Sequence, residues 1–188
     1  MITNKNPNGV TEFLEAFFPD ENELICLRTY IAKDAPKELK EKIEAKKFEP
    51  NVSTLKSDKG IQKELMERNE NCGVYFVVNS GGHSDVEIKR YNAVFVECDD
   101  IPIDEQHSEL DKSPIQPNIR IETKKSVPAY WLIDGDCSEI EWREIQERLI
   151  EFFDGDKQNK NPSRCMRVPF FDHVSFIENE PQYKTVEI

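Results

Sequence analysis

The chain has 188 residues, with 37 acidic and 25 basic side chains and a formal net charge of −12 at pH 7. No apolar run approaches the roughly 18 residues that a membrane span needs, and the first residues lack the apolar core of a signal peptide. The sequence therefore predicts a soluble, cytoplasmic protein without a membrane partner. The excess of acids argues against a general nucleic-acid-binding protein, because phosphate contacts require concentrated Lys and Arg.

The length of 188 residues fits one domain, or one domain with a small appendage. Hydrophobic spacing predicts a helix over 10–18, a strand over 24–31 and a helix over 59–70. The stretch 33–60 is rich in Lys and Glu, so it is either an exposed helix around 37–47 or a mobile connection.

From residue 73 onward the residue pattern becomes typical of strands. Strands are expected over 73–79 and 92–98, and the turn between them indicates that the two lie close together in one sheet. A capping box at Ser138–Glu141 starts a long helix that is expected to pack on a sheet. The remaining predicted elements are a polar helix over 103–112 and strands over 118–123, 129–133, 165–168, 174–177 and 183–186.

The five cysteines are odd in number, widely scattered and without CxxC spacing. This pattern indicates reduced, mostly packed thiols and argues against a disulfide framework or a zinc site. The three histidines also lack metal-ligand spacing, and His107, in an acidic helix, is expected to be solvated.

Two acids follow the apolar strand Ala93–Val96. Side chains two apart on a strand point to the same face, so Glu97 and Asp99 are expected to project together while Cys98 faces the other way. Paired carboxylates of this kind suit Mg²⁺ or Mn²⁺. The alternative is an ordinary acidic turn at a strand end.

Basic residues gather in two places. Lys124, Lys125 and Ser126 occupy a turn between two predicted strands, where charge and hydroxyl groups can hold a phosphate; a plain hairpin is the alternative. Arg164 and Arg167 follow the long helix, and their planar guanidinium groups suit a triphosphate. The alternative is that each pairs with a surface acid.

Three sequence blocks occur in a characteristic order. The first ends in AVFVECDD at 93–100, the second is IETKKSVPAYWLI at 121–133, and the third runs from the long helix through FFDGD at 152–156 to NPSRCMRVP at 161–169. Within residues 73–175 their order and spacing resemble the primase domains of phage and mobile-element replication proteins, in the archaeo-eukaryotic primase superfamily. The resemblance implies an α+β fold in which residues 1–70 form an N-terminal helical module of the same domain. Residues 71–188 would form the primase-like catalytic core, an RRM-like antiparallel sheet with flanking helices.

The resemblance also implies roles for individual residues. Glu97 and Asp99 correspond to the acidic first motif that binds the catalytic Mg²⁺ or Mn²⁺ ions. Asp156 is the best candidate for the third acid, although Asp154 is close enough to compete. Ser126 corresponds to the serine of the second motif. The residues implied to bind the nucleotide are Lys125, Ser126, Arg164 and Arg167.

The chain departs from the family pattern at two positions. Pro128 stands where the second motif has a histidine, and a proline side chain can neither donate a hydrogen bond nor carry charge. Either a neighbour such as Lys124, Lys125 or His173 substitutes, or the domain is impaired. Phe170 stands where the family has a glycine.

The resulting hypothesis is a DNA primase or primase-polymerase domain of phage or mobile-element replication. It would use nucleoside triphosphates to make RNA or DNA primers on a single-stranded DNA template, with a replicative helicase in the same chain or as a separate partner. One alternative is a catalytically impaired primase-like module that binds DNA or a replication partner. Another is an acidic interaction protein with an accidental resemblance to primases.

Overall fold

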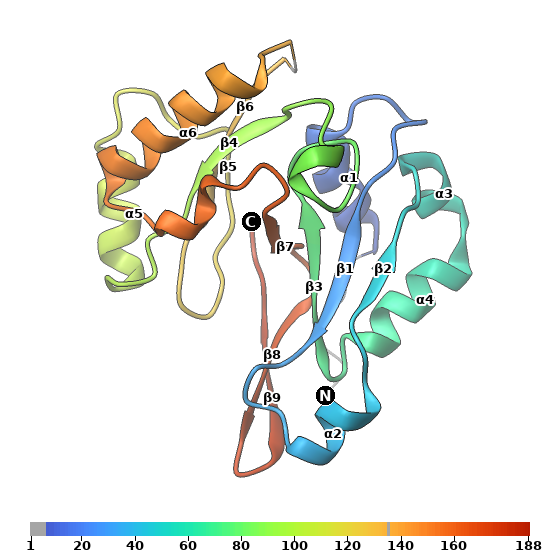
Figure 1. The fold of residues 1–188 in the computed structure, drawn as a ribbon. Coiled ribbons are helices and arrows are strands. Elements are labelled where there is room, and N and C mark those ends of the chain that lie inside the picture. The colour runs from blue at the N-terminus through green and yellow to red at the C-terminus, as the bar shows by residue number, and fades with distance from the viewer. Residues whose placement is uncertain (1–6, 135) are drawn as a thin grey trace. The chain divides into compact units, whose positions relative to one another are not determined.

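The computed structural model describes residues 7–134 and 136–188 (Figure 1). The chain forms two compact units, which are described separately below. The first unit comprises the residues up to Val77 together with Cys165–Val186, and the second comprises Val78–Arg164 with Glu187–Ile188. Helices and small antiparallel sheets occur in the chain, which confirms the predicted α+β class. No helix in the described ranges is long and apolar enough to cross a membrane.

The first unit contains a four-stranded antiparallel sheet with the order β2-β1-β3-β7 and a separate hairpin, β8-β9. Its helices are α1 (Pro7–Phe17), α2 (Lys37–Lys42), α3 (Val52–Ser57) and α4 (Lys59–Arg68). Its strands are β1 (Leu27–Ile31), β2 (Lys46–Phe48), β3 (Cys72–Val77), β7 (Cys165–Arg167), β8 (Asp172–Ile177) and β9 (Glu180–Thr185). The Lys- and Glu-rich stretch is therefore a short exposed helix, α2, followed by an edge strand.

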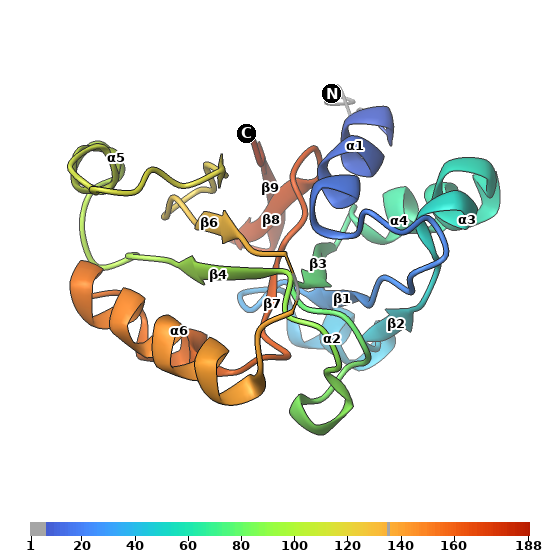
Figure 2. The same ribbon diagram turned by 90° about the horizontal axis from the view of Figure 1, so that it is seen from above.

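One face of this sheet forms the core of the first unit. Leu27 and Phe76 are cross-strand partners and are fully buried. The rings of Phe13 and Phe17 on α1 lie 5.2 and 5.0 Å from the ring of Phe76. Figure 2 shows α1 over this sheet, so the amphipathic helix predicted near the N-terminus covers the apolar face of the strands.

The second unit contains a three-stranded antiparallel sheet with the order β4-β6-β5. Its elements are the 3₁₀ turn η1 (Asp85–Glu87), β4 (Ala93–Val96), α5 (Ile103–Asp111), β5 (Ile119–Arg120), β6 (Ala129–Leu132), α6 (Glu139–Phe153) and the 3₁₀ turn η2 (Lys157–Lys160). The prediction that strands 73–79 and 92–98 share a sheet was wrong. Both edges of β3 are already paired, with β1 and β7, so β4 joins β6 instead.

Helix α6 lies along β4 (Figure 2) and covers the edge of the sheet that β4 forms. The Trp142 indole donates to the Ala93 carbonyl at 2.9 Å. The Gln146 side-chain amide donates to the Phe95 carbonyl at 2.6 Å and accepts from the Phe95 N–H at 3.0 Å. These bonds satisfy backbone groups that an edge strand would leave open. The predicted capping box at Ser138–Glu141 starts the helix, as expected.

Candidate functional site

The first candidate acid lies at the point where β4 ends. All four residues of β4 are buried, whereas Glu97 is only partly buried and Asp99 is exposed. The Ser126 hydroxyl donates a short hydrogen bond to Glu97 Oε1. The first two sequence blocks are therefore joined by a direct contact, although 28 residues separate Glu97 from Ser126 in the chain.

The turn that carries Ser126 is held from two sides. The hydroxyl oxygens of Ser126 and Thr123 are 3.0 Å apart, and the Ser126 N–H donates to Thr123 Oγ1 at 3.1 Å. Gln106 on α5 accepts from the Val127 N–H at 2.7 Å and donates to the Lys125 carbonyl at 3.0 Å. Because Thr123, Ser126 and Gln106 are all buried, the Ser126 hydroxyl has a fixed position beside Glu97.

Gln106 is a residue of the site that was not predicted from the sequence. Residues 103–112 were expected to form a polar helix, yet Gln106 and Leu110 are both buried. Their four-residue spacing puts them on one helical face. That spacing was the available signal, but it does not reveal that a glutamine would bridge to a turn nearly twenty residues away.

The third block meets the first block through the main chain. The Asp156 N–H donates to the Glu97 carbonyl at 2.8 Å. A Cβ atom at Gly155 would lie 2.4 Å from Val96 Cγ2, so only glycine permits this close approach. Asp154 ends α6 in the left-handed conformation, with φ 49°, and is exposed. The structure thus brings Asp156 next to Glu97.

The Asp156 carboxylate also contacts the arginine of its own block. Its Oδ2 accepts from Arg164 Nη2 at 3.3 Å, and both side chains are partly buried. Its Oδ1 accepts from the Gln158 N–H at 2.9 Å and caps η2. Arg164 therefore pairs with an acid, as the alternative interpretation expected, but that acid is itself a candidate metal ligand.

The acids make the surroundings of Glu97 electronegative. Burial, followed by the charge of Glu97, raises the pKa of the Cys98 thiol to about 11. Burial and the same charge also raise the pKa of the fully buried Tyr130 hydroxyl. Of these two causes, only the charge of the carboxylates bears on a cation, which it would attract.

No protein-family model and no curated protein sequence matches the chain. Among solved structures, the AEP domain of the cyanophage S-2L primase-polymerase, PrimPol, matches with a TM-score of 0.68 and 25% identity, over 87% of this chain and 82% of that chain. Primase RepB′ matches with a TM-score of 0.62 and 14% identity, over 96% of this chain and 55% of that chain. The catalytic domain of RepB′ in complex with initiator DNA matches with a TM-score of 0.57 and 16% identity, over 89% and 78%. The chain has an archaeo-eukaryotic primase-type fold.

The other two candidate nucleotide-binding residues, Lys125 and Arg167, belong to different units. Lys125 is exposed on the turn beside the buried Ser126. Arg167 belongs to the first unit, on β7, where its guanidinium lies 4.8 Å from the centre of the Tyr75 ring. Its Nη2 is 3.3 Å from His173 Nε2. Lys125 is thus placed with the acids and Ser126 in the second unit, and Arg167 is not.

Both departures from the primase pattern have visible structural consequences. Pro128 is buried at the start of β6, and its carbonyl accepts from the Ile121 N–H at 2.9 Å. The position contributes to the strand ladder but offers no side-chain donor. Phe170 adopts φ 66°, a left-handed conformation that favours glycine. A bulky side chain therefore stands at a backbone position that glycine would adopt with less strain.

The candidate metal ligands of this primase-type fold are all carboxylates. Glu97, Asp99 and Asp156 offer only oxygen atoms, which are the donors that Mg²⁺ and Mn²⁺ prefer. Asp99 follows Glu97 by two residues, and the Asp156 amide is bonded to the Glu97 carbonyl. These oxygen donors suit a divalent cation in type, but among the described residues the three carboxylates do not come close enough to one another to form a single ligand group.

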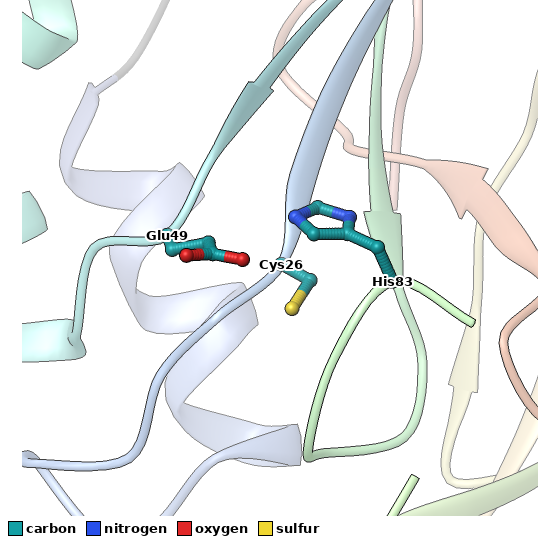
Figure 3. A group of neighbouring side chains, drawn as sticks. All are labelled: Cys26, Glu49 and His83. Carbon is teal, nitrogen blue, oxygen red and sulfur yellow. The ribbon is translucent and has the colours of Figure 1, made fainter. Parts of the chain in front are cut away.

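A different trio of potential ligands is shown in Figure 3. Cys26 is buried, Glu49 is exposed, and both belong to the first unit, whereas His83 belongs to the second. Because this trio is divided between the two units, it is not a candidate metal site of either unit by itself. A thiol and an imidazole also differ from the oxygen donors that Mg²⁺ prefers.

Proposed function

We propose that the chain is a nucleotidyltransferase of the primase-polymerase kind, which makes primers on a single-stranded DNA template in phage or mobile-element replication. The observation that carries the proposal is the joining of the three sequence blocks in a primase-type fold. Ser126 donates to Glu97, and the Asp156 amide donates to the Glu97 carbonyl. Nucleoside triphosphates are the proposed substrates, and a replicative helicase, in the same chain or separate, is the proposed partner.

Glu97, Asp99 and Asp156 would hold the Mg²⁺ or Mn²⁺ ions. When bound, such ions lower the pKa of an attacking 3′-hydroxyl and stabilise the departing pyrophosphate. The part that Ser126 plays is to orient Glu97, since its hydroxyl donates to one carboxylate oxygen. Ser126 would therefore support nucleotide binding through Glu97.

Basic side chains would hold the triphosphate. Lys125 is exposed on the Ser126 turn, and Arg164 lies at the edge of the acidic cluster through its bond to Asp156. Charge-assisted hydrogen bonds from these cations would neutralise phosphate oxygens. Arg167 is proposed to contact the triphosphate or the template from the first unit.

Pro128 favours a second candidate function. A proline at the histidine position of the second motif removes a donor that the family uses toward the nucleotide. The chain would then be a primase-like module that binds DNA or a replication partner without catalysis.

A primer-synthesis assay tests the first function. The full chain, single-stranded DNA, Mn²⁺ and labelled nucleotides should give labelled products, and the double variant Glu97→Ala/Asp99→Ala should give none because the metal ligands are lost. The matched control is Asp104→Ala/Glu105→Ala, which removes two exposed acids of the same unit. Synthesis that persists in the first variant would refute the metal assignment.

Thermal unfolding separates the two functions. A ligand at about 100 times its dissociation constant adds about 2.7 kcal/mol to the free energy of unfolding. Mn²⁺ with a nucleotide should therefore raise the melting temperature of the enzyme. Absence of both a shift and a product would favour the non-catalytic module.

A further inference from the structure

A row of polar side chains crosses one face of the four-stranded sheet in the first unit. Backbone pairing puts Lys47 on β2 opposite Arg28 on β1. It also puts Arg28 opposite Tyr75 on β3, and Tyr75 opposite Arg167 on β7. Cross-strand partners project to the same side of a sheet. The residues that alternate with them are buried on the side that α1 covers, so the row lies on the other side, which faces the viewer in Figure 1.

This side of the sheet, here called the open face, carries no acidic residue on its four strands. Its strand residues are three cations, two tyrosines and three others: Lys47, Arg28, Arg167, Tyr30, Tyr75, Gly73, Val77 and Cys165. The acid nearest to Lys47 in the sequence is Glu49, which lies beyond the end of β2 with its carboxylate within 4.8 Å of the Cys26 thiol. The open face is therefore basic, in a chain with a net charge of −12.

Tyrosines hold two of the cations in place. Arg28 Nη1 donates to the Tyr30 hydroxyl at 3.0 Å. The Arg167 guanidinium lies 4.8 Å from the centre of the Tyr75 ring, and the rings of Tyr30 and Tyr75 are 5.5 Å apart. The four side chains thus form one continuous series of contacts across β1, β3 and β7.

Arg167 lies across β3. A Cβ atom at Gly73 would be 2.7 Å from Arg167 Nη1, so the guanidinium occupies space that glycine leaves open. A guanidinium stacked on one ring can offer its other side to a base and its N–H groups to a phosphate. Because this arrangement is preformed, a ligand would not have to order the arginine first.

These features fit a single-stranded nucleic acid. A row of cations suits phosphates, and exposed rings and guanidinium planes suit the unstacked bases that a single strand offers. A duplex keeps its bases paired and stacked, and an acidic peptide would leave the planar groups unused. Three strand spacings of about 4.8 Å separate β2 from β7, so a short stretch of strand would cover the row.

We propose that the open face binds single-stranded DNA without sequence preference. Lys47, Arg28 and Arg167 contact phosphates, while bases stack on the Arg167 guanidinium and on Tyr30, whose side chain is 37% exposed. The proposal rests on the proposed function in that the strand would be the template. The binding itself requires neither a metal ion nor a nucleotide, so it can be tested separately.

Fluorescence anisotropy in EDTA, without nucleotide, tests the proposal on the full chain. The probe is a labelled strand of about 12 thymidines, and its counterpart is a duplex of the same length. The single strand should bind at least about tenfold more tightly than the duplex. Equal binding of the two would overturn the proposal, as would displacement of the strand by poly-glutamate as readily as by unlabelled strand.

Variants locate the binding surface. Lys47→Ala/Arg28→Ala should weaken strand binding about tenfold or more, because two phosphate contacts are lost. Tyr30→Leu keeps the charge and should weaken it about fivefold or more, because a stacking surface is lost. The matched control is Lys42→Ala/Lys63→Ala, which removes two exposed lysines of the same unit, on α2 and α4. Equal affinity of the open-face variants and the control would overturn the proposal.

Folding of the variants is checked by circular dichroism, and each should melt with the parent chain. Lys47→Glu keeps the test decisive if the Arg28 substitution disturbs β1, because Lys47 is exposed on an edge strand. This single change should weaken strand binding about fivefold or more. Unchanged affinity in a folded Lys47→Glu chain would overturn the proposal.

The metal-ligand variant distinguishes this proposal from the enzymatic one. Glu97→Ala/Asp99→Ala should bind the strand at least as tightly as the parent, although it should make no primers. A parent chain that binds the strand but makes no primers would refute the enzyme and support the open face. A parent that makes primers, with Lys47→Ala/Arg28→Ala binding the strand at full affinity, would refute the open face alone.

Discussion

At the scale of single residues, the contact between Ser126 and Glu97 changes how the second motif is understood. Family resemblance assigns the serine to the nucleotide, but its buried hydroxyl donates to the carboxylate of the first motif. Thr123 fixes that hydroxyl from the other side. We infer that a side chain in this position acts through Glu97 and thereby on the affinity for the proposed metal ion.

We therefore expect Ser126→Ala to weaken Mn²⁺ binding about tenfold, as loss of a hydrogen bond to a ligating carboxylate typically does. The Mn²⁺ dissociation constant can be measured by electron paramagnetic resonance, in the absence of nucleotide. Ser108→Ala, an exposed serine on α5, is the control. An unchanged Mn²⁺ affinity together with a higher KM for the nucleotide would show that the hydroxyl contacts the substrate directly.

At the scale of elements, the junction of α6 with β4 supports the site. Trp142 and Gln146 bond to the backbone of β4, whose end carries Glu97, while the segment after α6 carries Asp156. Helix α6 therefore covers the edge of β4 and leads into the segment that places Asp156 beside Glu97.

Gln146→Ala should lower the free energy of unfolding by about 1–3 kcal/mol, because it leaves the buried N–H and carbonyl of Phe95 without their side-chain partner. Urea denaturation measures the change. Glu147→Ala alters the exposed neighbour on the same helix and should stay within about 0.5 kcal/mol of the parent. If the two variants lost the same stability, the edge contact would not be important.

Residue patterns within a segment predicted the helices and strands well. They predicted less well which strands pair with one another. The capping box of α6 is encoded within one helix and was found, but the predicted apolar face was only partly right, because Trp142 is buried whereas Ile140, Ile145 and Phe152 are exposed. The pairing of β3 with β1 and β7 joins distant segments, and the simple expectation that β3 and β4 share a sheet failed. The contact between Ser126 and Glu97 depends on the buried Gln106, which holds the backbone of the Ser126 turn. No residue pattern predicts this role.

At the scale of the whole molecule, a net charge of −12 limits how the chain can bind DNA. The cations Lys157, Lys160, Arg164 and Arg167 are concentrated in one short segment, where Asp156 is the single acid. A chain of this kind can contact only a few phosphates at once. Its attraction to a strand would be local, whereas the acidic surface elsewhere repels the backbone.

Single-stranded DNA binding should therefore depend weakly on salt. Each neutralised phosphate contributes about 0.7 to the slope of log affinity against log salt, so these four cations and the two others of the open face predict a slope no steeper than about −4. Anisotropy titrations at several NaCl concentrations measure it, and Lys157→Ala/Lys160→Ala should reduce the slope. Lys37→Ala/Lys40→Ala, on the exposed α2, should not. A much steeper slope would show that the strand contacts a far larger surface.

The bond from the Asp156 amide to the Glu97 carbonyl has a consequence for how the site can be studied and how it can diverge. The tether is made entirely by main-chain atoms, so replacing either side chain leaves it intact. The backbone arrangement of the site therefore does not depend on which side chains these two positions carry. Related chains could exchange or lose individual acids while keeping the same architecture, and substitutions in this chain should report on the functional groups themselves.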